Sequence, residues 1–284
     1  MGLAFRKIWR DMRNNLGRTV LVVASIAIGV LALGLIVSGR TLMARQMIVS
    51  QTESHPTTLR LSIGPSVDDT TLDMIRRQPG VVGARGVVYS GIRWKPSTDA
   101  EWTDASLVAI EDYETQVYDL ITRREGAWPS SGRLAVEHNH VAPYNVPAVG
   151  GTIYFEVNDR AKPMIVAGVV RDPREIGPPF TNQPTFYLTR SEMTALGQSD
   201  RFNSIQVDVA DFSQERAEAV QRQLTDRLDE LGVSVNDAEI NAPERHFLQD
   251  VMDGVTMILT VMALLSLGMS TILVVNTINA ILAQ

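Results

Sequence analysis

Two long apolar segments lie near the two ends of the chain, and a region of mixed composition separates them. The first segment, Val20–Val37, runs for 18 residues without a charged residue or a proline. As a helix it would span about 27 Å, close to the ~30 Å hydrocarbon core of a bilayer. A cleaved signal peptide is the alternative, but its apolar run is usually about 7–15 residues long, and no A-x-A site precedes Arg40. We therefore predict a transmembrane helix over residues 20–38.

The second apolar segment, Val255–Leu282, reaches almost to the end of the sequence, and no charged residue occurs from Gly254 to Gln284. We predict a second transmembrane helix over residues 254–284. It is longer than a membrane crossing requires, so its end is expected to project beyond the hydrocarbon. Because no Lys or Arg anchor follows this segment, we interpret the chain as the N-terminal part of a longer protein.

The region between these segments, residues 39–253, shows the periodicities of both strands and helices. Alternating or continuous apolar runs predict strands over residues 57–63, 81–94, 106–110, 204–209 and 233–237. Apolar stripes and helix-ending residues predict helices over residues 40–54, 68–78, 113–124, 213–231 and 243–253. The helix over residues 213–231 carries a continuous stripe of Ala217, Val220, Leu224, Leu228 and Leu231.

Residues 126–188 differ from the rest, because short apolar runs alternate there with turns rich in Pro and Gly. This pattern predicts a small β-rich subdomain. The strand–helix–strand unit before it resembles the unit after it, so we expect the two to pair in one layer. The predicted fold class is an α+β domain, an α/β layer with an inserted β-rich subdomain, flanked by two transmembrane α-helices.

Positive charge is concentrated at the N-terminus. Residues 1–19 carry five Lys or Arg and one Asp, a net charge of +4, so the remaining residues carry −6 − 4 = −10. The positive-inside rule places residues 1–19 in the cytoplasm and residues 39–253 outside it. We predict a multi-pass protein of the cell (inner) membrane with a large extracytoplasmic domain. Such an acidic domain is a poor electrostatic match for nucleic acid, so no nucleic-acid partner is expected.

Residues 1–19 also have a helical pattern of their own, with apolar and basic residues on opposite faces. The pattern predicts an amphipathic helix at the cytoplasmic membrane interface, although an unstructured basic leader is the alternative. The expected interface residues are Phe5, Ile8, Trp9, Arg10 and Arg13.

Small residues four positions apart occur twice around the first apolar segment. Such pairs let a second helix approach closely, so we expect the first transmembrane helix to pack against another helix. The two pairs are Ser25 with Gly29 and Gly34 with Ser38.

Several kinds of chemistry lack the residues that they need. The chain has no cysteine, which excludes disulfides, thiol catalysis and Cys-based zinc sites. None of its three lysines follows a glycine, so it has no G-x-x-x-x-G-K-[ST] loop for nucleotide phosphates, and it has no G-x-S-x-G elbow. We predict a non-catalytic protein with no catalytic residue and no cofactor.

His138 and His140 suggest a metal site, because alternate residues of a strand point to the same side and imidazole binds zinc or copper. However, no third ligand is evident, and a turn follows at Pro143. We therefore expect exposed histidines at the edge of a loop and no metal. Asp68 and Asp69 are interpreted as the cap of the helix that follows them, and not as a catalytic carboxylate pair.

Three motifs carry a resemblance to a known family. The turn Asn15–Thr19, which fits N-x-x-R-[ST], leads from a basic helix into the first apolar segment. Gly126-Ala127-Trp128-Pro129 precedes the apolar run Arg133–Val136, and Val149–Ile153 forms a Gly-containing turn before a strand. In this order the motifs resemble the N-terminal part of MacB/FtsX-type permeases of ABC transporters, although Gly151 stands where that family usually has Asp.

The resemblance implies a permease subunit with a MacB-like periplasmic core domain over residues 39–253. The implied partners are an ABC ATPase subunit on the cytoplasmic side, a second permease copy or a homologous permease, the lipid bilayer, and periplasmic or extracellular proteins. The implied mechanism is mechanotransmission, in which the ATPase moves the transmembrane helices and the outer domain follows, for export or extraction of a substrate. A two-pass transmembrane sensor with an extracytoplasmic ligand-binding domain stays open as the alternative.

Overall fold

The computed structural model describes residues 54–175, 177, 178, 180–242 and 249–282, together with residues 16, 17, 20, 24, 27, 31, 34 and 38. The chain divides into two compact units. One comprises Ile48–His246, and the other comprises Met1–Met47 with Phe247–Gln284. Each unit is described by itself.

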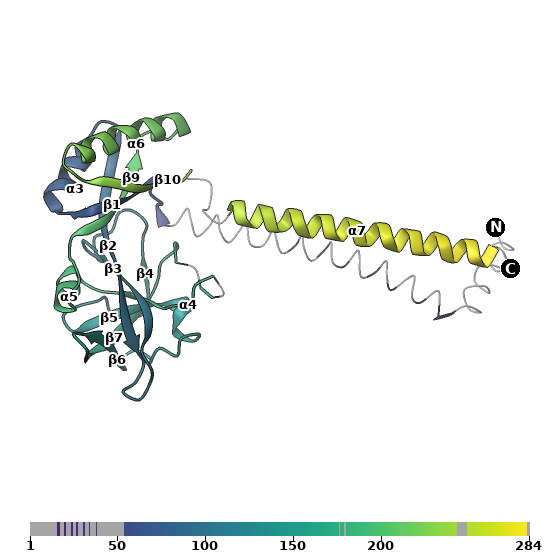
Figure 1. Ribbon diagram of the computed structural model, residues 1–284, viewed down its shortest axis with the longest axis horizontal. Helices are drawn as coiled ribbons and strands as arrows, with labels where there is room; N and C mark the ends of the chain where they lie inside the picture. The colour runs from purple at the N-terminus through teal and green to yellow at the C-terminus, as the bar shows by residue number, and fades with distance from the viewer. Residues whose placement is uncertain are drawn as a thin grey trace. The chain divides into compact units, whose positions relative to one another are not determined.

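The unit of residues 48–246 is built on one mixed sheet (Figure 1). Its elements are, in chain order, β1 (Leu59–Val67), α3 (Asp69–Arg76), β2 (Val81–Lys95), β3 (Thr103–Ile110), β4 (Thr122–Gly126), β5 (Arg133–Glu137), α4 (His138–Val141), β6 (Thr152–Val157), β7 (Arg160–Arg171), β8 (Thr185–Tyr187), α5 (Arg190–Ala195), β9 (Phe202–Val209), α6 (Gln214–Asp229) and β10 (Ser234–Ile240). The strand order is β10-β1-β9-β2-β3-β8-β5-β7-β4, and β6 pairs with β2 and β7.

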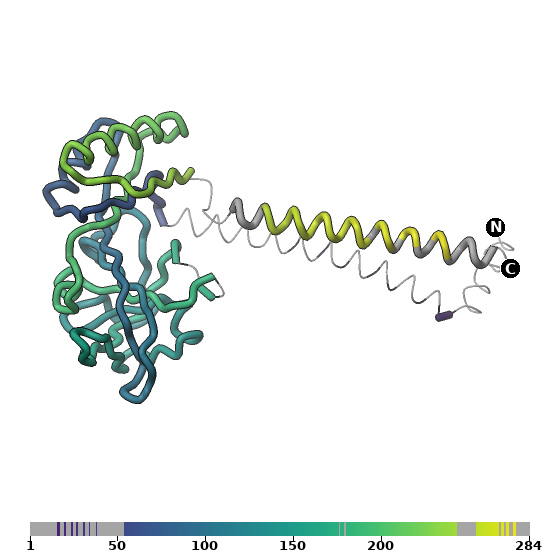
Figure 2. The backbone as a smooth tube through the Cα atoms, viewed as in Figure 1, coloured from purple at the N-terminus to yellow at the C-terminus, as the bar shows by residue number. Residues whose placement is uncertain are grey.

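The predicted pairing of the two strand–helix–strand units is present in the structure. β1-α3-β2 and β9-α6-β10 interlock so that β1 lies between β10 and β9, and β9 lies between β1 and β2. All of these neighbours are antiparallel. Figure 2 shows β1 and β10 side by side, although they come from opposite ends of the unit. The layer therefore closes only when both ends of the unit have formed.

Alternation along the strands and a stripe along each helix build the core of this layer. Leu59, Leu61 and Ile63 of β1 are buried, whereas the residues between them are partly exposed. They belong to the same hydrophobic cluster as the buried residues of the two helices. Those helix residues are Leu72 and Ile75 of α3, with Val220, Leu224 and Leu228 of α6. One apolar face of each element is thus removed from water, which stabilises the layer.

Gly86 in β2 lets two neighbouring strands pack closely. A Cβ atom at this position would lie 2.4 Å from the ring of Phe202, the first residue of β9. No larger residue fits beneath the ring without displacing it, and Phe202 is fully buried. The glycine therefore fixes the packing of an aromatic side chain over the centre of the sheet.

The β-rich half of the unit continues the same sheet. β8 pairs in parallel with β3, and β5 pairs in parallel with β7. The short apolar runs predicted in residues 126–188 lie mainly in the strands β5, β6, β7 and β8. A second hydrophobic cluster around Tyr113 and Tyr187 joins these strands to β2 and β3.

The predicted helix over residues 113–124 is wrong. Residues 111–121 form successive bends, and β4 begins at Thr122. Side chains hold the bends, because Asp112 accepts hydrogen bonds from the backbone N–H of Glu114 at 2.9 Å and from Oγ1 of Thr115 at 2.6 Å. Such local bonds compete with a helix, and the β-branched and aromatic residues of the segment favour extended structure.

The five predicted strands and the predicted helices over 68–78 and 213–231 are present with shifted ends, and one residue was misplaced. The helix predicted over 213–231 begins at Gln214, with Ser213 as its N-cap, and ends at Asp229. Leu231 is therefore not on the buried stripe, and its side chain is 51% exposed. The interpretation of Asp68 as a cap is confirmed, because its side chain accepts a hydrogen bond from the N–H of Thr71.

In the other unit the structure describes α7 (Gln249–Leu282) and eight helical residues of the N-terminal segment. The predicted helix over residues 40–54 lies outside the described residues except for Ser54, and residues 243–248 also lie outside them. Across the residues that are described, no helix meets the combined length and hydropathy that a membrane crossing requires. The transmembrane helices over residues 20–38 and 254–284 therefore stay predictions.

Candidate functional site

The two ends of the unit of residues 48–246 meet at one point of the sheet. The backbone N–H of Asn241, just after β10, donates a hydrogen bond to the carbonyl of Thr58 at 2.8 Å. Leu59 and Ile240 are paired in the adjacent strands β1 and β10. The chain therefore comes into the unit and leaves it through neighbouring positions.

The incoming segment is bound to two loops from other parts of the sheet. Thr57 donates a hydrogen bond from Oγ1 to Oδ2 of Asp119 at 2.5 Å. The same carboxylate forms an ion pair with Nη1 of Arg174 at 3.2 Å. We call Thr57, Asp119 and Arg174 the junction. It ties the start of the domain to the β3–β4 loop and to the loop that follows β7.

Backbone hydrogen bonds reinforce the junction. The carbonyls of Ser54 and His55 accept the N–H groups of Leu120 and Asp119 at 2.8 and 2.9 Å. Asp119 has a φ of +45°, a left-handed conformation that Asp tolerates better than most residues. It is also almost fully buried, and burial lowers the pKa of its partner Arg174. Removing one partner of such a buried ion pair leaves the other charge buried and uncompensated, which strongly destabilises the folded state.

Next to the junction, Glu137 is buried at the carboxyl end of β5. β5 and β7 are parallel, so both strands end at the same edge of the sheet. Glu137 accepts hydrogen bonds there from Nη1 of Arg171 at 2.9 Å and from the backbone N–H of Asp172 at 2.8 Å. Burial nevertheless dominates and raises the pKa of Glu137 to about 7.

Two further carboxylates approach the same place from the loop after β7. Asp172 accepts a hydrogen bond from the hydroxyl of Tyr187 at 3.3 Å, and Glu175 accepts one from Oγ1 of Thr185 at 3.1 Å. Burial raises the pKa of Asp172, and it raises the pKa of Glu175 to about 7. Glu137, Asp172 and Glu175 form an acid cluster that fastens this loop to β5 and β8.

The two histidines lie in different surroundings, which corrects one prediction. They are part of the one-turn helix α4, and His138 is exposed, as expected. His140 is fully buried, and its Nδ1 accepts the backbone N–H of Thr185 at 3.0 Å. The expectation of two exposed histidines was wrong for His140 because the turn rotates it inward onto β8. Over the part of the chain that the structure describes, no group of three His, Asp or Glu side chains is placed to hold a metal ion.

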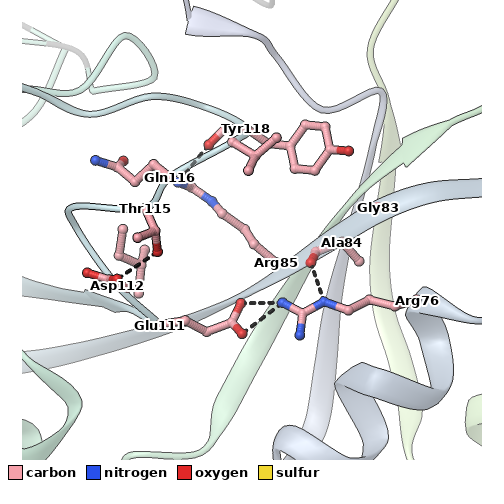
Figure 3. Close-up of a pocket in the computed structure, with 11 residues that line it drawn as sticks. Arg76, Gly83, Ala84, Arg85, Glu111, Asp112, Thr115, Gln116 and Tyr118 are labelled. Carbon is pink, nitrogen blue, oxygen red and sulfur yellow. Dashed lines mark hydrogen bonds and ion pairs between the residues drawn. The ribbon is translucent and has the colours of Figure 1, made fainter.

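A cavity of about 270 Å³ opens between α3, β2 and the β3–β4 loop (Figure 3). Arg76 and Glu111 face each other on one side of it, with Nη2 of Arg76 2.7 Å from both carboxylate oxygens. Arg85 reaches from β2 to the loop, where its Nη1 donates to the carbonyl of Tyr118 at 3.0 Å. A Cβ atom at Gly83 would lie 2.4 Å from the hydroxyl of Tyr118, so the glycine makes room for this ring.

The interface and helix-packing residues predicted from sequence lie mostly outside the described residues. This holds for Phe5, Ile8, Trp9, Arg10 and Arg13, and for Ser25 and Gly29. Gly34 and Ser38 are helical, and a Cβ atom at Gly34 would meet no atom within 4 Å. Both proposed roles stay predictions.

Sequence reasoning missed the junction, the acid cluster and the cavity. Their members are separated by long stretches of chain, as with Thr57 and Asp119, which are 62 residues apart. The one available signal was the run Arg171–Glu175, whose acidic and basic residues lie between two apolar segments of the sequence. A charge run of this kind is usually solvated, so the pattern alone did not reveal its burial.

A comparison with protein families identifies the family of this chain. The MacB-like periplasmic core domain family matches residues 19–227, well over half of the sequence. The chain therefore belongs to this family, which confirms the resemblance. A comparison with curated proteins finds no match.

Three solved structures are similar to this chain. The extracellular domain of the noncanonic ABC-type transporter YknZ from Gram-positive bacteria is 11% identical, with 63% of this chain and 100% of that chain covered and a TM-score of 0.44. The periplasmic region of MacB from Actinobacillus actinomycetemcomitans is 16% identical, with 70% and 92% covered and a TM-score of 0.45. A domain of a putative permease protein from Porphyromonas gingivalis is 14% identical, with 63% and 77% covered and a TM-score of 0.38.

Proposed function

We propose that this protein is the membrane subunit of an ABC transporter of the MacB/FtsX type. In this proposal residues 39–253 lie outside the cytoplasm, and residues 20–38 and 254–284 cross the membrane. A separate ATPase subunit hydrolyses ATP on the cytoplasmic side, and the outer domain changes its arrangement in response. The observation that carries the proposal is the family match over residues 19–227.

The composition of the flanking segments supports the membrane anchoring. α7 is 34 residues long and has no charged residue after Asp253. Many of its large apolar side chains are exposed, which in water would be unfavourable and marks a surface for lipid or another helix. They include Val255, Met257, Ile258, Met262, Leu264, Leu265, Met269 and Ile272.

The geometry of the extracytoplasmic unit suits the transmission of a movement. Both connections to the flanking segments leave from the hydrogen-bonded pair Thr58 and Asn241. A displacement of the incoming segment acts on the α/β layer through Thr58 and on the β-rich half through the junction. Two helices that move together would therefore pull on both halves of the sheet at once.

Isolation of the protein from its native membrane tests the proposal. We expect a nucleotide-binding ABC subunit to copurify and to hydrolyse ATP, whereas the 284-residue chain alone should neither bind nor hydrolyse it. Saturable ATP hydrolysis by the chain alone would contradict the proposal. So would copurification of a signalling kinase without any ABC subunit, which would favour the sensor.

A further inference from the structure

We propose that the cavity beside Arg85 is a binding site for a carboxylate, either of a peptide or of a small organic acid. The inference goes beyond the transporter assignment and does not depend on the membrane arrangement. It rests on the charges that line the cavity, on the one charge there that no opposite charge contacts among the described residues, and on the preformed shape of the β3–β4 loop.

Three of the four charged residues that line the cavity are already engaged. Arg76 donates from Nε to the carbonyl of Ala84 at 2.8 Å, from Nη1 to Asp73 at 2.9 Å, and from Nη2 to Glu111 at 2.7 Å. The carboxylate of Glu111 also accepts the N–H of Gly86 at 3.3 Å. Asp112 accepts the two hydrogen bonds that shape the loop. None of these three groups needs a further partner.

Arg85 is the exception. Its Nε donates to Oε1 of Gln206 at 2.7 Å and its Nη1 donates to the carbonyl of Tyr118 at 3.0 Å, and both acceptors are neutral. Within the described part of the chain, no carboxylate oxygen contacts its guanidinium, and its Nη2 has no hydrogen-bond partner. The charge of Arg85 acts on Asp172 only at a distance, where it lowers the raised pKa of that carboxyl. One positive charge in the cavity is therefore left for a ligand.

The two hydrogen bonds hold the guanidinium plane in place before any ligand arrives. Gln206, which anchors one side of it, is fully buried on β9. The loop on the other side is braced by Gln116, whose side chain bonds the carbonyl of Tyr113 at 2.8 Å and the N–H of Ile121 at 2.9 Å. A preorganised donor loses little conformational entropy on binding, which favours affinity.

The same surroundings select the charge of the ligand. Glu111 and Asp112 line the cavity together with Arg85, so a dianion such as phosphate would be repelled by two nearby carboxylates. A single carboxylate matches one free guanidinium edge and can form a charge-assisted hydrogen bond with it. Val117, whose side chain is 60% exposed, lines the same cavity and offers an apolar contact to the carbon skeleton of the ligand.

Calorimetric titration of the 284-residue chain in detergent tests the site with four probes. They are N-acetyl-trialanine with a free C-terminus, the same peptide with a C-terminal amide, propionate as a small organic acid with one carboxylate, and inorganic phosphate. We expect the free-acid peptide to bind at least about tenfold more tightly than the amide, because the amide lacks the charge that Arg85 requires. Binding of propionate without binding of the peptide would identify a small organic acid as the source of the carboxylate.

Two variants and one control connect binding to the cavity. Arg85→Gln should abolish the preference for the free acid. Val117→Glu, on an exposed side chain, should weaken acid binding about tenfold through repulsion without disturbing the fold. Leu231→Glu, also on an exposed side chain but outside the cavity, should leave binding unchanged. Equal affinity for acid and amide, tighter binding of phosphate, no binding of any carboxylate, or no effect of Val117→Glu would overturn the inference.

Discussion

Oγ1 of Thr57 donates a 2.5 Å hydrogen bond to Oδ2 of Asp119, a residue 62 positions further along the chain. Both side chains are buried, and the carboxylate is shared with Arg174 at 3.2 Å. This contact joins the first residues of the extracytoplasmic unit to two loops of its β-rich half. It links the incoming segment to the part of the sheet that lies beyond β3.

We expect the extracytoplasmic unit to fold without its flanking segments. Its two ends are hydrogen-bonded to each other, and one large hydrophobic cluster contains residues of both of its halves. Residues 51–250 should therefore be soluble and unfold cooperatively, with a midpoint that EDTA does not change. Leu224→Ala should lower the free energy of unfolding by about 2–5 kcal/mol, because the side chain is fully buried on α6. Urea denaturation measures both the cooperativity of unfolding and the change in its free energy. A gradual, non-cooperative transition would show that the unit needs its flanking segments to fold. A midpoint that falls on chelation would show that it needs a metal ion.

Loss of the charge of Asp119 should destabilise this unit far more than loss of an exposed counterpart. Asp119→Asn keeps the shape and the left-handed backbone but leaves Arg174 buried and unpaired, which should cost about 3 kcal/mol. Asp211 is a matched control, because it also has a positive φ and also pairs with an arginine, at 3.3 Å, but it is 93% exposed. Asp211→Asn should cost less than about 1 kcal/mol in the same urea experiment. Equal costs would mean that the junction contributes no more than a surface ion pair.

The acid cluster should make stability fall as the pH rises. Burial raises the pKa of both Glu137 and Glu175 from 4.5 to about 7, so between these values the folded state binds more protons than the unfolded state. The contribution of the two protonated groups to the free energy of unfolding is complete below about pH 4.5, and it is lost as the pH rises through about 7. Glu137→Gln removes one of these two groups. The variant should therefore lose less unfolding free energy than the native protein between pH 5 and pH 8, by up to about 3 kcal/mol.

Urea denaturation at a series of pH values measures this slope. Glu215→Gln, on an exposed side chain at the start of α6, should keep the slope of the native protein. If Glu137→Gln and the native protein lose the same free energy of unfolding between pH 5 and pH 8, Glu137 does not cause the pH dependence.

The α/β layer could be predicted from sequence because its information is local. The stripe of α6 and the alternation of β1 each follow from a few neighbouring residues, and similar units on both sides of the β-rich region suggested the pairing of the two. The segment 113–124 failed because its bends depend on side-chain bonds from Asp112 and Gln116, which compete with helical hydrogen bonds. Residue spacing does not reveal such competition.

The candidate sites could not be predicted because each depends on contacts between distant parts of the chain. Glu137, Asp172 and Glu175 are ordinary acidic residues in sequence, and only the parallel pairing of β5 with β7 brings them together. In the same way, nothing in the sequence indicates that Arg76 contacts a carboxylate in the folded structure and that Arg85 contacts two neutral acceptors. Burial and pairing of charge are properties of the tertiary structure, and local patterns carry little information about them.

The orientation of the chain in a membrane is the most direct test of the account. The native protein has no cysteine, so a single introduced thiol reports its own location. Ser97→Cys lies on the exposed β2–β3 hairpin, and Gly2→Cys lies in the basic N-terminal segment. In intact spheroplasts a membrane-impermeant maleimide should label the thiol at position 97 and should label the one at position 2 only after permeabilisation. Labelling of position 2 in intact cells while position 97 stays protected would contradict both the orientation and the proposed function.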